Sequence, residues 1–300
     1  MRTSSSITIT AILAVAATPL QAKERTPLSP STPWNIHYAN DSCRLVRTFG
    51  KGDEAVSLVM DRFEPGDQFK LIFVGKSLKR RNDGSMLDGR LRFGPDADDQ
   101  DVAVFTGTHG DLPALIVHGP LRIIPLTKDQ EAAQEAAWDA GREYILPPIS
   151  EERKAQVRWL NLSRILTKDV VLETGSLAKP LAALETCSWD LLKVWGLDPE
   201  QQKTLTRQVR PVRGMAGEIS PDDYPEDMLR KGGQGTVTVR LLVDAQGKVT
   251  SCKNLVLTKD TDFGEVVCQK FRSIKFDPAL DSAGRPAPSY YIQSVTFRME

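Results

Sequence analysis

Three histidines, His37, His109 and His118, are the side chains best suited to proton transfer in this chain. His109 lies in the glycine-containing stretch 107–111, which is typical of a loop. A histidine acts as a general base only when a reacting proton is within its reach, and a Ser-His-Asp triad is assembled in space rather than in sequence. None of the three stands in a motif with a catalytic partner. We therefore expect surface or core roles for them, and we predict no catalytic residue and no enzymatic activity.

Two runs of charge are the next candidates for a site. Carboxylate oxygens are what calcium prefers, but the acidic run lacks the spacing, central glycine and terminal glutamate of a calcium-binding loop. The basic run lies in a polar stretch, where such charges are usually solvated. We expect solvated loops in both places and predict no metal site and no cofactor. The acidic run is Asp96, Asp98, Asp99 and Asp101, and the basic run is Lys76, Lys79, Arg80 and Arg81.

The four cysteines are Cys43, Cys187, Cys252 and Cys268. No two of them form a Cys-x-x-Cys pair, which argues against zinc binding and redox catalysis. An even number of cysteines in an exported chain favours disulfides, and three pairings exist on paper. Cys252 falls in an expected strand and Cys268 in the helix that follows and packs back on it, so we pair these two and join Cys43 to Cys187. The alternative is four buried thiols.

The N-terminus has the layout of a secretory signal. Arg2 is followed by the apolar residues 7–17 and then by small and polar residues up to Ala22. We expect residues 1–22 to be a signal peptide and the protein to be periplasmic, with no stable membrane span. The alternative is an inner-membrane anchor through residues 7–17 that leaves the chain facing the periplasm. The run is short for an anchor, since a spanning helix needs about 20 apolar residues.

The charge balance excludes some partners. Lys and Arg together number 39, as do Asp and Glu, so the net charge is zero. A broad surface for nucleic acid needs an excess of positive charge, and we predict no nucleic-acid partner. Hydrophobic residues make up 40% and charged residues 26% of the chain, which is ordinary for a globular protein.

The elements that must position any site fall into two domains. Residues 23–33 are rich in Pro, Ser and Thr, and we expect a short flexible lead. Residues 34–210 form a β-rich domain that we predict to be a sandwich or a curled sheet. The linker between the domains is expected at 207–214. Within the first domain we predict strands at 34–39, 43–49, 55–63, 68–74, 90–93, 101–106, 114–118, 121–125, 156–162 and 169–173, and helices near 128–144 and 177–206.

Residues 214–300 have the clearest plan. A short helical run, 226–231, ends at Gly232, since glycine tolerates the positive φ of a helix C-terminus. Strands follow at 236–243 and 248–257, then a helix that begins at Asp262, then a strand at 290–299. The first strand alternates Val237, Val239, Leu241 and Val243, as a half-buried strand does. The whole chain is therefore predicted to be α+β.

Four motifs occur in order in this segment: Tyr224-Pro225, Gly235-Thr236-Val237, Val243-Asp244 with Gly247, and Phe276-Asp277-Pro278-Ala279. In these residues the segment 214–300 resembles the C-terminal domain of the TonB family of energy transducers. The family's best-known form of the first motif is Gln-Pro-x-Tyr-Pro. This chain has Ser220 in place of the glutamine and one more residue between Pro221 and Tyr224.

The resemblance implies a binding protein linked to TonB-dependent transport rather than an enzyme. We expect an envelope protein or an outer-membrane receptor peptide as partner, added as a strand to the edge of the C-terminal sheet. The same edge is also suited to pairing with a second copy of the chain. The expected partner-binding residues are Pro221, Tyr224, Pro225, Ser294, Val295, Thr296, Phe297 and Arg298.

Two other functions stay open at this point. One is a structural envelope adaptor, in which the β-rich domain binds the ligand and the C-terminal domain only docks. The other is an enzyme with its site in residues 34–210. TonB-type transducers also carry an ionisable histidine in their membrane helix. Residues 7–17 hold no ionisable side chain, so we do not expect this chain to be a transducer of proton-motive force itself.

Overall fold

A computed structural model describes residues 27–81, 84, 86–139, 144–213, 215, 217–255 and 262–299. The expected signal peptide, 1–22, and the first residues of the expected lead, 23–26, lie outside this described part. Within it, no helix is long and apolar enough to span a membrane. The chain has helices and strands in both halves, which confirms the predicted α+β class.

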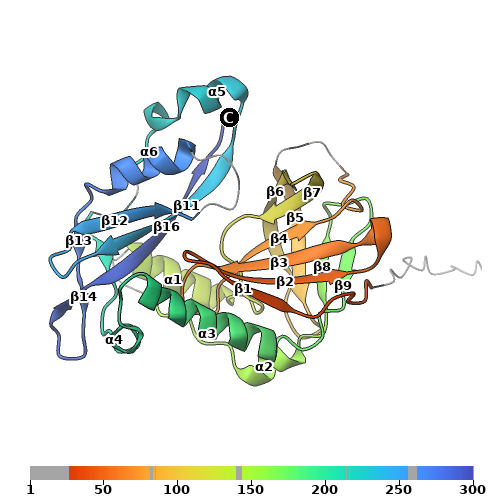
Figure 1. The fold of residues 1–300 in the computed structure, drawn as a ribbon, viewed down its shortest axis with the longest axis horizontal. Coiled ribbons are helices and arrows are strands. Elements are labelled where there is room, and N and C mark those ends of the chain that lie inside the picture. The colour runs from red at the N-terminus through yellow and green to blue at the C-terminus, as the bar shows by residue number, and fades with distance from the viewer. Residues whose placement is uncertain are drawn as a thin grey trace, which may run out of the picture.

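A single antiparallel sheet of nine strands forms the N-terminal part of the molecule (Figure 1). Side chains alternate across it: in the strand Met86–Phe93, Leu87, Leu91 and Phe93 point into the core. The sheet order is β1-β2-β3-β4-β7-β6-β5-β8-β9. The strands are β1 (Asn35–Tyr38), β2 (Cys43–Phe49), β3 (Val56–Arg62), β4 (Lys70–Val74), β5 (Met86–Phe93), β6 (Gln100–His109), β7 (Leu112–Val117), β8 (Leu160–Ser163) and β9 (Val170–Leu172).

The sheet curls so that the segment just before it bridges β9, at one end, and β2, next to the other end. Leu28 pairs with Leu172 of β9, and Pro30 pairs with Phe49 of β2. Backbone bonds from Leu28 N–H to the Val171 carbonyl and from Gly50 N–H to the Ser29 carbonyl, both 2.8 Å, hold this bridge. The described part of the expected flexible lead is therefore bonded to the sheet. Its strand-forming partners lie far away in sequence, so its Pro- and Ser-rich composition did not reveal them.

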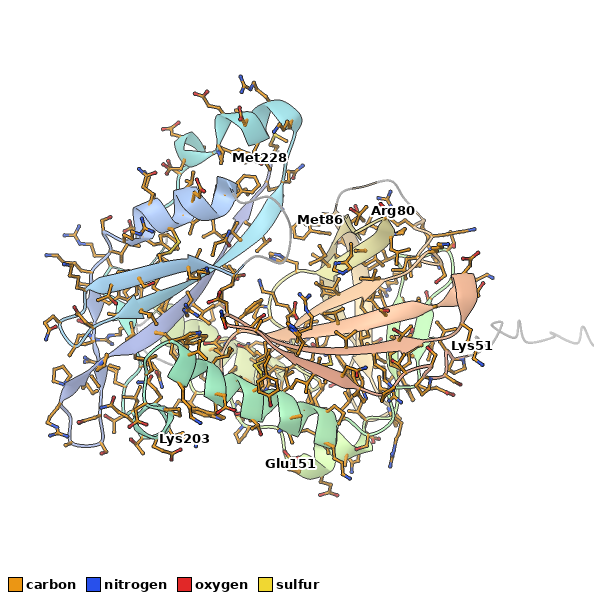
Figure 2. The ribbon with its side chains drawn as sticks, viewed as in Figure 1. Lys51, Arg80, Met86, Glu151, Lys203 and Met228 are labelled. Carbon is orange, nitrogen blue, oxygen red and sulfur yellow. A yellow bond between two sulfur atoms is a disulfide. The ribbon has the colours of Figure 1, made fainter. Side chains whose placement is uncertain are left out.

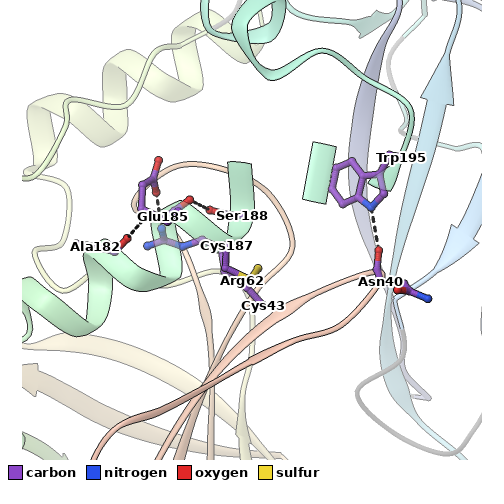
Figure 3. Close-up of a disulfide and its surroundings, with 9 residues drawn as sticks. Asn40, Cys43, Arg62, Ala182, Glu185, Cys187, Ser188 and Trp195 are labelled. Atoms are coloured by element: carbon purple, nitrogen blue, oxygen red, sulfur yellow. Dashed lines mark hydrogen bonds and ion pairs between the residues drawn. A yellow bond between two sulfur atoms is a disulfide. The ribbon is translucent and has the colours of Figure 1, made fainter. Parts of the chain in front are cut away.

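Helices cover the inner face and one end of this sheet (Figure 1). The longest, α3 (Ala178–Val194), buries Leu181, Leu184 and Leu191 against the sheet, and the disulfide Cys43–Cys187 ties it to β2 (Figure 3). Figure 2 shows Lys203 of α4 and Glu151 of α2 along the same side of the molecule. The other helices of this part are η1 (Gly52–Glu54), α1 (Lys128–Asp139), α2 (Glu151–Gln156) and α4 (Pro199–Lys203).

One predicted strand in this half is wrong, and another begins later than predicted. Residues 121–125 form no strand, because only Leu121 makes a bridge, to Phe69. The strand expected at 156–162 starts later, at Leu160, and is preceded by α2. Ser150 begins that helix by accepting a hydrogen bond from the Arg153 N–H, at 3.3 Å, which is an N-cap.

The C-terminal part has the predicted order of helix, strand, strand, helix and strand. Its sheet order is β12-β11-β16, so the last strand lies beside the first and not beside the second. One sheet face packs on α6 through Val239, Leu241, Val267 and Phe271, and the disulfide Cys252–Cys268 joins β12 to α6. The elements are η2 (Pro221–Asp223), α5 (Glu226–Lys231), β11 (Gly235–Val243), β12 (Val249–Asn254), α6 (Asp262–Phe271) and β16 (Ser289–Phe297).

The segment expected to be a free linker belongs to this C-terminal part. Its strand β10 (Arg210–Pro211) pairs with β13 (Phe276–Asp277), and Val209 is buried in the C-terminal core. A further small pair joins β14 (Ala279–Leu280) to β15 (Pro286–Ala287). These partners come from loops distant in sequence, which is why composition alone suggested a linker.

The second face of the C-terminal sheet packs against one end of the N-terminal sheet (Figure 1). Arg240 of β11 donates to Asp41, at 3.0 Å, and its guanidinium carbon lies 4.2 Å from the centre of the Trp195 ring. Trp195 also meets Tyr290 of β16, with ring centres 5.4 Å apart, and its indole donates to the Asn40 carbonyl (Figure 3). The polar side chains that alternate along β11 therefore face the N-terminal part of the chain rather than solvent.

Candidate partner-binding edge

β16 is an edge strand. It pairs with β11 along its whole length, from Ser289 opposite Val243 to Phe297 opposite Gly235, and no described strand pairs with its other side. The prediction that the last strand would lie beside the hairpin and leave an edge is confirmed. An open edge presents unpaired N–H and C=O groups to an extended peptide.

The backbone of Ser294 points out from this edge. The Leu255 N–H donates to the Thr238 carbonyl at 2.8 Å, so the backbone groups of Thr238 face β12. Ser294 lies opposite Thr238 on the other side of β11. Residues in an antiparallel pair either exchange both hydrogen bonds or none, so the N–H and C=O of Ser294 face away from β11. In agreement, the Ser294 carbonyl accepts a 2.8 Å bond from its neighbouring side chain, Gln293.

The alternation fixes the direction of the neighbouring groups. Backbone groups of successive strand residues point to opposite sides, so Ile292 and Thr296 also present theirs outward. Val295 lies opposite Val237 and is bonded to β11. These three residues, at every second position, therefore present their backbone N–H and C=O groups on the open side of β16, where an added strand can bond to them. Arg298 lies just beyond the end of the strand and is exposed.

The 221–225 segment reaches the same end of β16 through Tyr224. The Tyr224 ring stands edge-on to Phe297 and to Phe263, with ring centres 5.5 Å apart in both cases. Its hydroxyl donates to the Gly233 carbonyl. Pro221 begins η2 and Pro225 precedes α5. The structure therefore brings Tyr224 and Phe297 together, as expected from the sequence. Both rings pack against Phe263 of α6.

Asp223 anchors this segment to α6. Its carboxylate lies 2.7 Å from Lys270 and accepts a bond from the Ser220 N–H at 2.9 Å. The Lys270 ammonium, followed by the Ser220 N–H, lowers the pKa of Asp223 to about 2. Because the carboxylate form is the one that binds, this anchor is complete above the ordinary pKa of 3.8 and weakens as the pH falls toward 2.

Lys70 of β4 is the main N-terminal group under β16. Its ammonium donates to the Thr238 hydroxyl and lies 3.5 Å from the Ser294 hydroxyl, and the residue is 8% exposed. Burial lowers its pKa to about 8, although Asp61 acts in the opposite direction. His118 lies beside it, 3.3 Å from the Thr236 hydroxyl. This histidine lies at the contact between the two halves of the chain.

The turn after β3 also comes close to the edge strand. Burial raises the pKa of Glu64 to about 7. Burial, together with the Glu64 charge, raises the pKa of Tyr291 of β16 to about 12. The Tyr291 hydroxyl lies 3.2 Å from the Gln293 amide oxygen. Glu64 is therefore protonated at neutral pH to a larger extent than a glutamate in water.

Sequence reasoning missed the groups from residues 27–206 that meet this sheet, Lys70, Asp41 and Trp195. The polar residues Thr236, Thr238 and Arg240 indicated that this face of β11 does not lie against an apolar core. No local pattern in the sequence indicated what covers it. Within the described residues, no group of three or more His, Cys, Asp and Glu side chains is placed to hold a metal ion.

The edge strand, its helix and the Tyr224 contact form a small α+β module, and a known family matches this part of the chain. Residues 220–299 match the family described as Gram-negative bacterial TonB protein C-terminal. The resemblance expected from the four motifs is therefore confirmed for this segment. The match does not include the residues before 220. A search of curated proteins found no match to the chain.

Proposed function

We propose that this chain is a periplasmic, non-enzymatic protein linked to TonB-dependent transport. Its C-terminal domain binds an extended peptide of an envelope protein or outer-membrane receptor by adding it to the β16 edge. The family match of residues 220–299 supports the link to transport. The two disulfides support an oxidising compartment, because disulfides seldom persist in the cytosol of mesophiles.

The observation that carries the proposal is the outward row of backbone groups at Ile292, Ser294 and Thr296. Strand addition takes its affinity from main-chain hydrogen bonds, and pockets for alternate side chains add selectivity. It therefore needs no special side-chain motif. Tyr224 packs on Phe297 at the end of the strand where the peptide would begin or end.

The test removes one outward donor without disturbing the ladder to β11. In Thr296→Pro the lost N–H belongs to the open side, where proline is tolerated in an edge strand. The matched control is Thr296→Ala, which loses the hydroxyl and keeps the N–H. Each variant carries a photocrosslinking amino acid at the exposed position Arg298 and is irradiated in cells.

We expect a crosslinked adduct with the wild-type edge and with Thr296→Ala, and loss of at least about 90% of it with Thr296→Pro, since one backbone bond at a tight edge contributes roughly 1–2 kcal/mol. Circular dichroism checks that the proline variant is folded. A folded Thr296→Pro variant that retains the adduct would contradict edge addition. An adduct of twice the chain's mass would identify a second copy as the occupant.

A further inference from the structure

A cleft of about 650 Å³ opens where the curled sheet nearly closes on itself. It lies along the seam that residues 27–30 bridge, between Arg47 of β2 and Asn161 of β8, and Trp159 lines it as well. The seam is held by polar bonds: Arg47 donates to the Thr174 carbonyl at 2.9 Å. Clefts of this size are where small ligands commonly bind.

The side chains in the cleft combine an aromatic ring with planar polar groups. Trp159 offers a ring that is partly exposed, and Arg92 lies over that ring at 5.9 Å. Arg47 and Arg158 bring two guanidinium groups, against one carboxylate, Glu173. The charge of this lining is therefore positive by one, which favours a ligand with a negative charge.

One polar group in the lining has unused hydrogen-bonding capacity. The Asn161 amide oxygen, which lines the cleft, makes no hydrogen bond within the described residues. On the neighbouring strand, Arg92 lies directly opposite Asn161. Buried polar groups are nearly always hydrogen-bonded, so the Asn161 amide is suited to bond a polar group of a ligand.

We propose that this seam cleft binds an acidic saccharide. A sugar ring has an apolar face that packs on an aromatic ring such as Trp159. Its hydroxyl groups are both donors and acceptors, which suits the amide of Asn161 and the guanidinium groups. A carboxylate on the sugar suits Arg158, which is exposed and lines the cleft. The site is separate from the β16 edge.

The test uses the exported chain, residues 23–300, and three probes: a hyaluronan tetrasaccharide, which alternates an acidic and an N-acetylated sugar, the neutral chitotetraose, and triglutamate. Binding is followed by NMR through the indole N–H resonance of Trp159, assigned with Trp159→Phe. We expect the hyaluronan tetrasaccharide to move this resonance with a Kd on the order of 0.1–1 mM, a range usual for weak small ligands.

Arg158→Gln removes the charge from an exposed residue and leaves the fold intact. It should weaken hyaluronan tetrasaccharide binding by about tenfold, as expected for one charge-assisted hydrogen bond, and leave chitotetraose binding unchanged. Arg213→Gln, an exposed arginine of the C-terminal part, is the matched control and should change neither.

Three results would overturn the proposal. The first is that neither saccharide moves the Trp159 resonance. The second is that both saccharides bind equally and Arg158→Gln has no effect, which would show that the acidic group of the ligand does not matter. The third is triglutamate binding as tightly as the hyaluronan tetrasaccharide, which would assign the cleft to an acidic peptide instead.

Discussion

At the scale of single residues, Lys70 places a buried positive charge at the interface between the two halves, and burying this charge costs free energy. A buried ammonium without a carboxylate of its own is destabilised, because the protein interior solvates it less well than water does. Its partners are hydroxyl groups, and the nearby Asp61 is already engaged by Arg44, at 2.7 and 2.8 Å. This residue therefore links the stability of the packed arrangement to pH.

The prediction for Lys70 follows from its lowered pKa. Between about 8 and the ordinary 10.5, the unfolded chain binds the proton more tightly than the folded one, so the stability contributed by Lys70 rises with pH across that window. We expect the stability of wild type relative to Lys70→Met to increase by up to ~3 kcal/mol from pH 8 to 10.5. Urea unfolding at several pH values measures it. The exposed control, Lys253→Met, should show parallel curves, and parallel curves for Lys70→Met would refute the effect.

At the scale of the element, the two residues next to each other in β16 have opposite roles. Thr296 presents its N–H outward and Val295 presents its N–H to β11. A substitution by proline thus tests different things at the two positions, although the sequence change looks the same.

Val295→Pro should damage the fold. It removes a ladder hydrogen bond from a paired position and forces the ring against β11, and proline in the interior of a regular element costs roughly 3 kcal/mol or more. We expect a lower melting temperature and a loss of β signal in circular dichroism, while Thr296→Pro loses less than about 1 kcal/mol. A Thr296→Pro variant less stable than Val295→Pro would show that the phase of the strand has been assigned the wrong way round.

At the scale of the whole molecule, the two halves are joined by polar and aromatic contacts around Arg240. This guanidinium is 7% exposed, bonds Asp41 and covers Trp195. Removing one partner of a largely buried pair leaves a charge without compensation. The connection is therefore expected to depend on a few side chains rather than on a broad apolar surface.

We expect Arg240→Ala to lower the stability of the joined protein by about 2–3 kcal/mol, somewhat less than for a fully buried pair because Asp41 remains partly hydrated. Calorimetry should then resolve the unfolding of the two halves as separate transitions. Lys253→Ala is the matched control, since Lys253 meets the same Asp41 at 3.7 Å but is exposed, and it should change stability by under ~0.5 kcal/mol. A single unchanged transition in Arg240→Ala would show that other contacts join the halves.

The elements of the C-terminal module and their order can be predicted from the sequence. Local patterns carry that information: Val237 to Val243 alternate with period two, and Gly232 ends α5 in the left-handed region, at φ 66°. The positions of Cys252 and Cys268 on a strand and on the helix packed against it were enough to pair them, and this pairing is confirmed.

How the strands of the first half join could not be predicted in this way. Pairing of β5 with β8, or of Leu28 with Leu172, involves residues far apart in sequence, and no local preference selects such partners. The outward direction of the Ser294 and Thr296 backbone was likewise not readable, because it depends on the hydrogen bond that Thr238 makes on the far side of β11. Side-chain alternation can be read from a sequence, whereas the edge a backbone donor faces is set by its neighbours in the sheet.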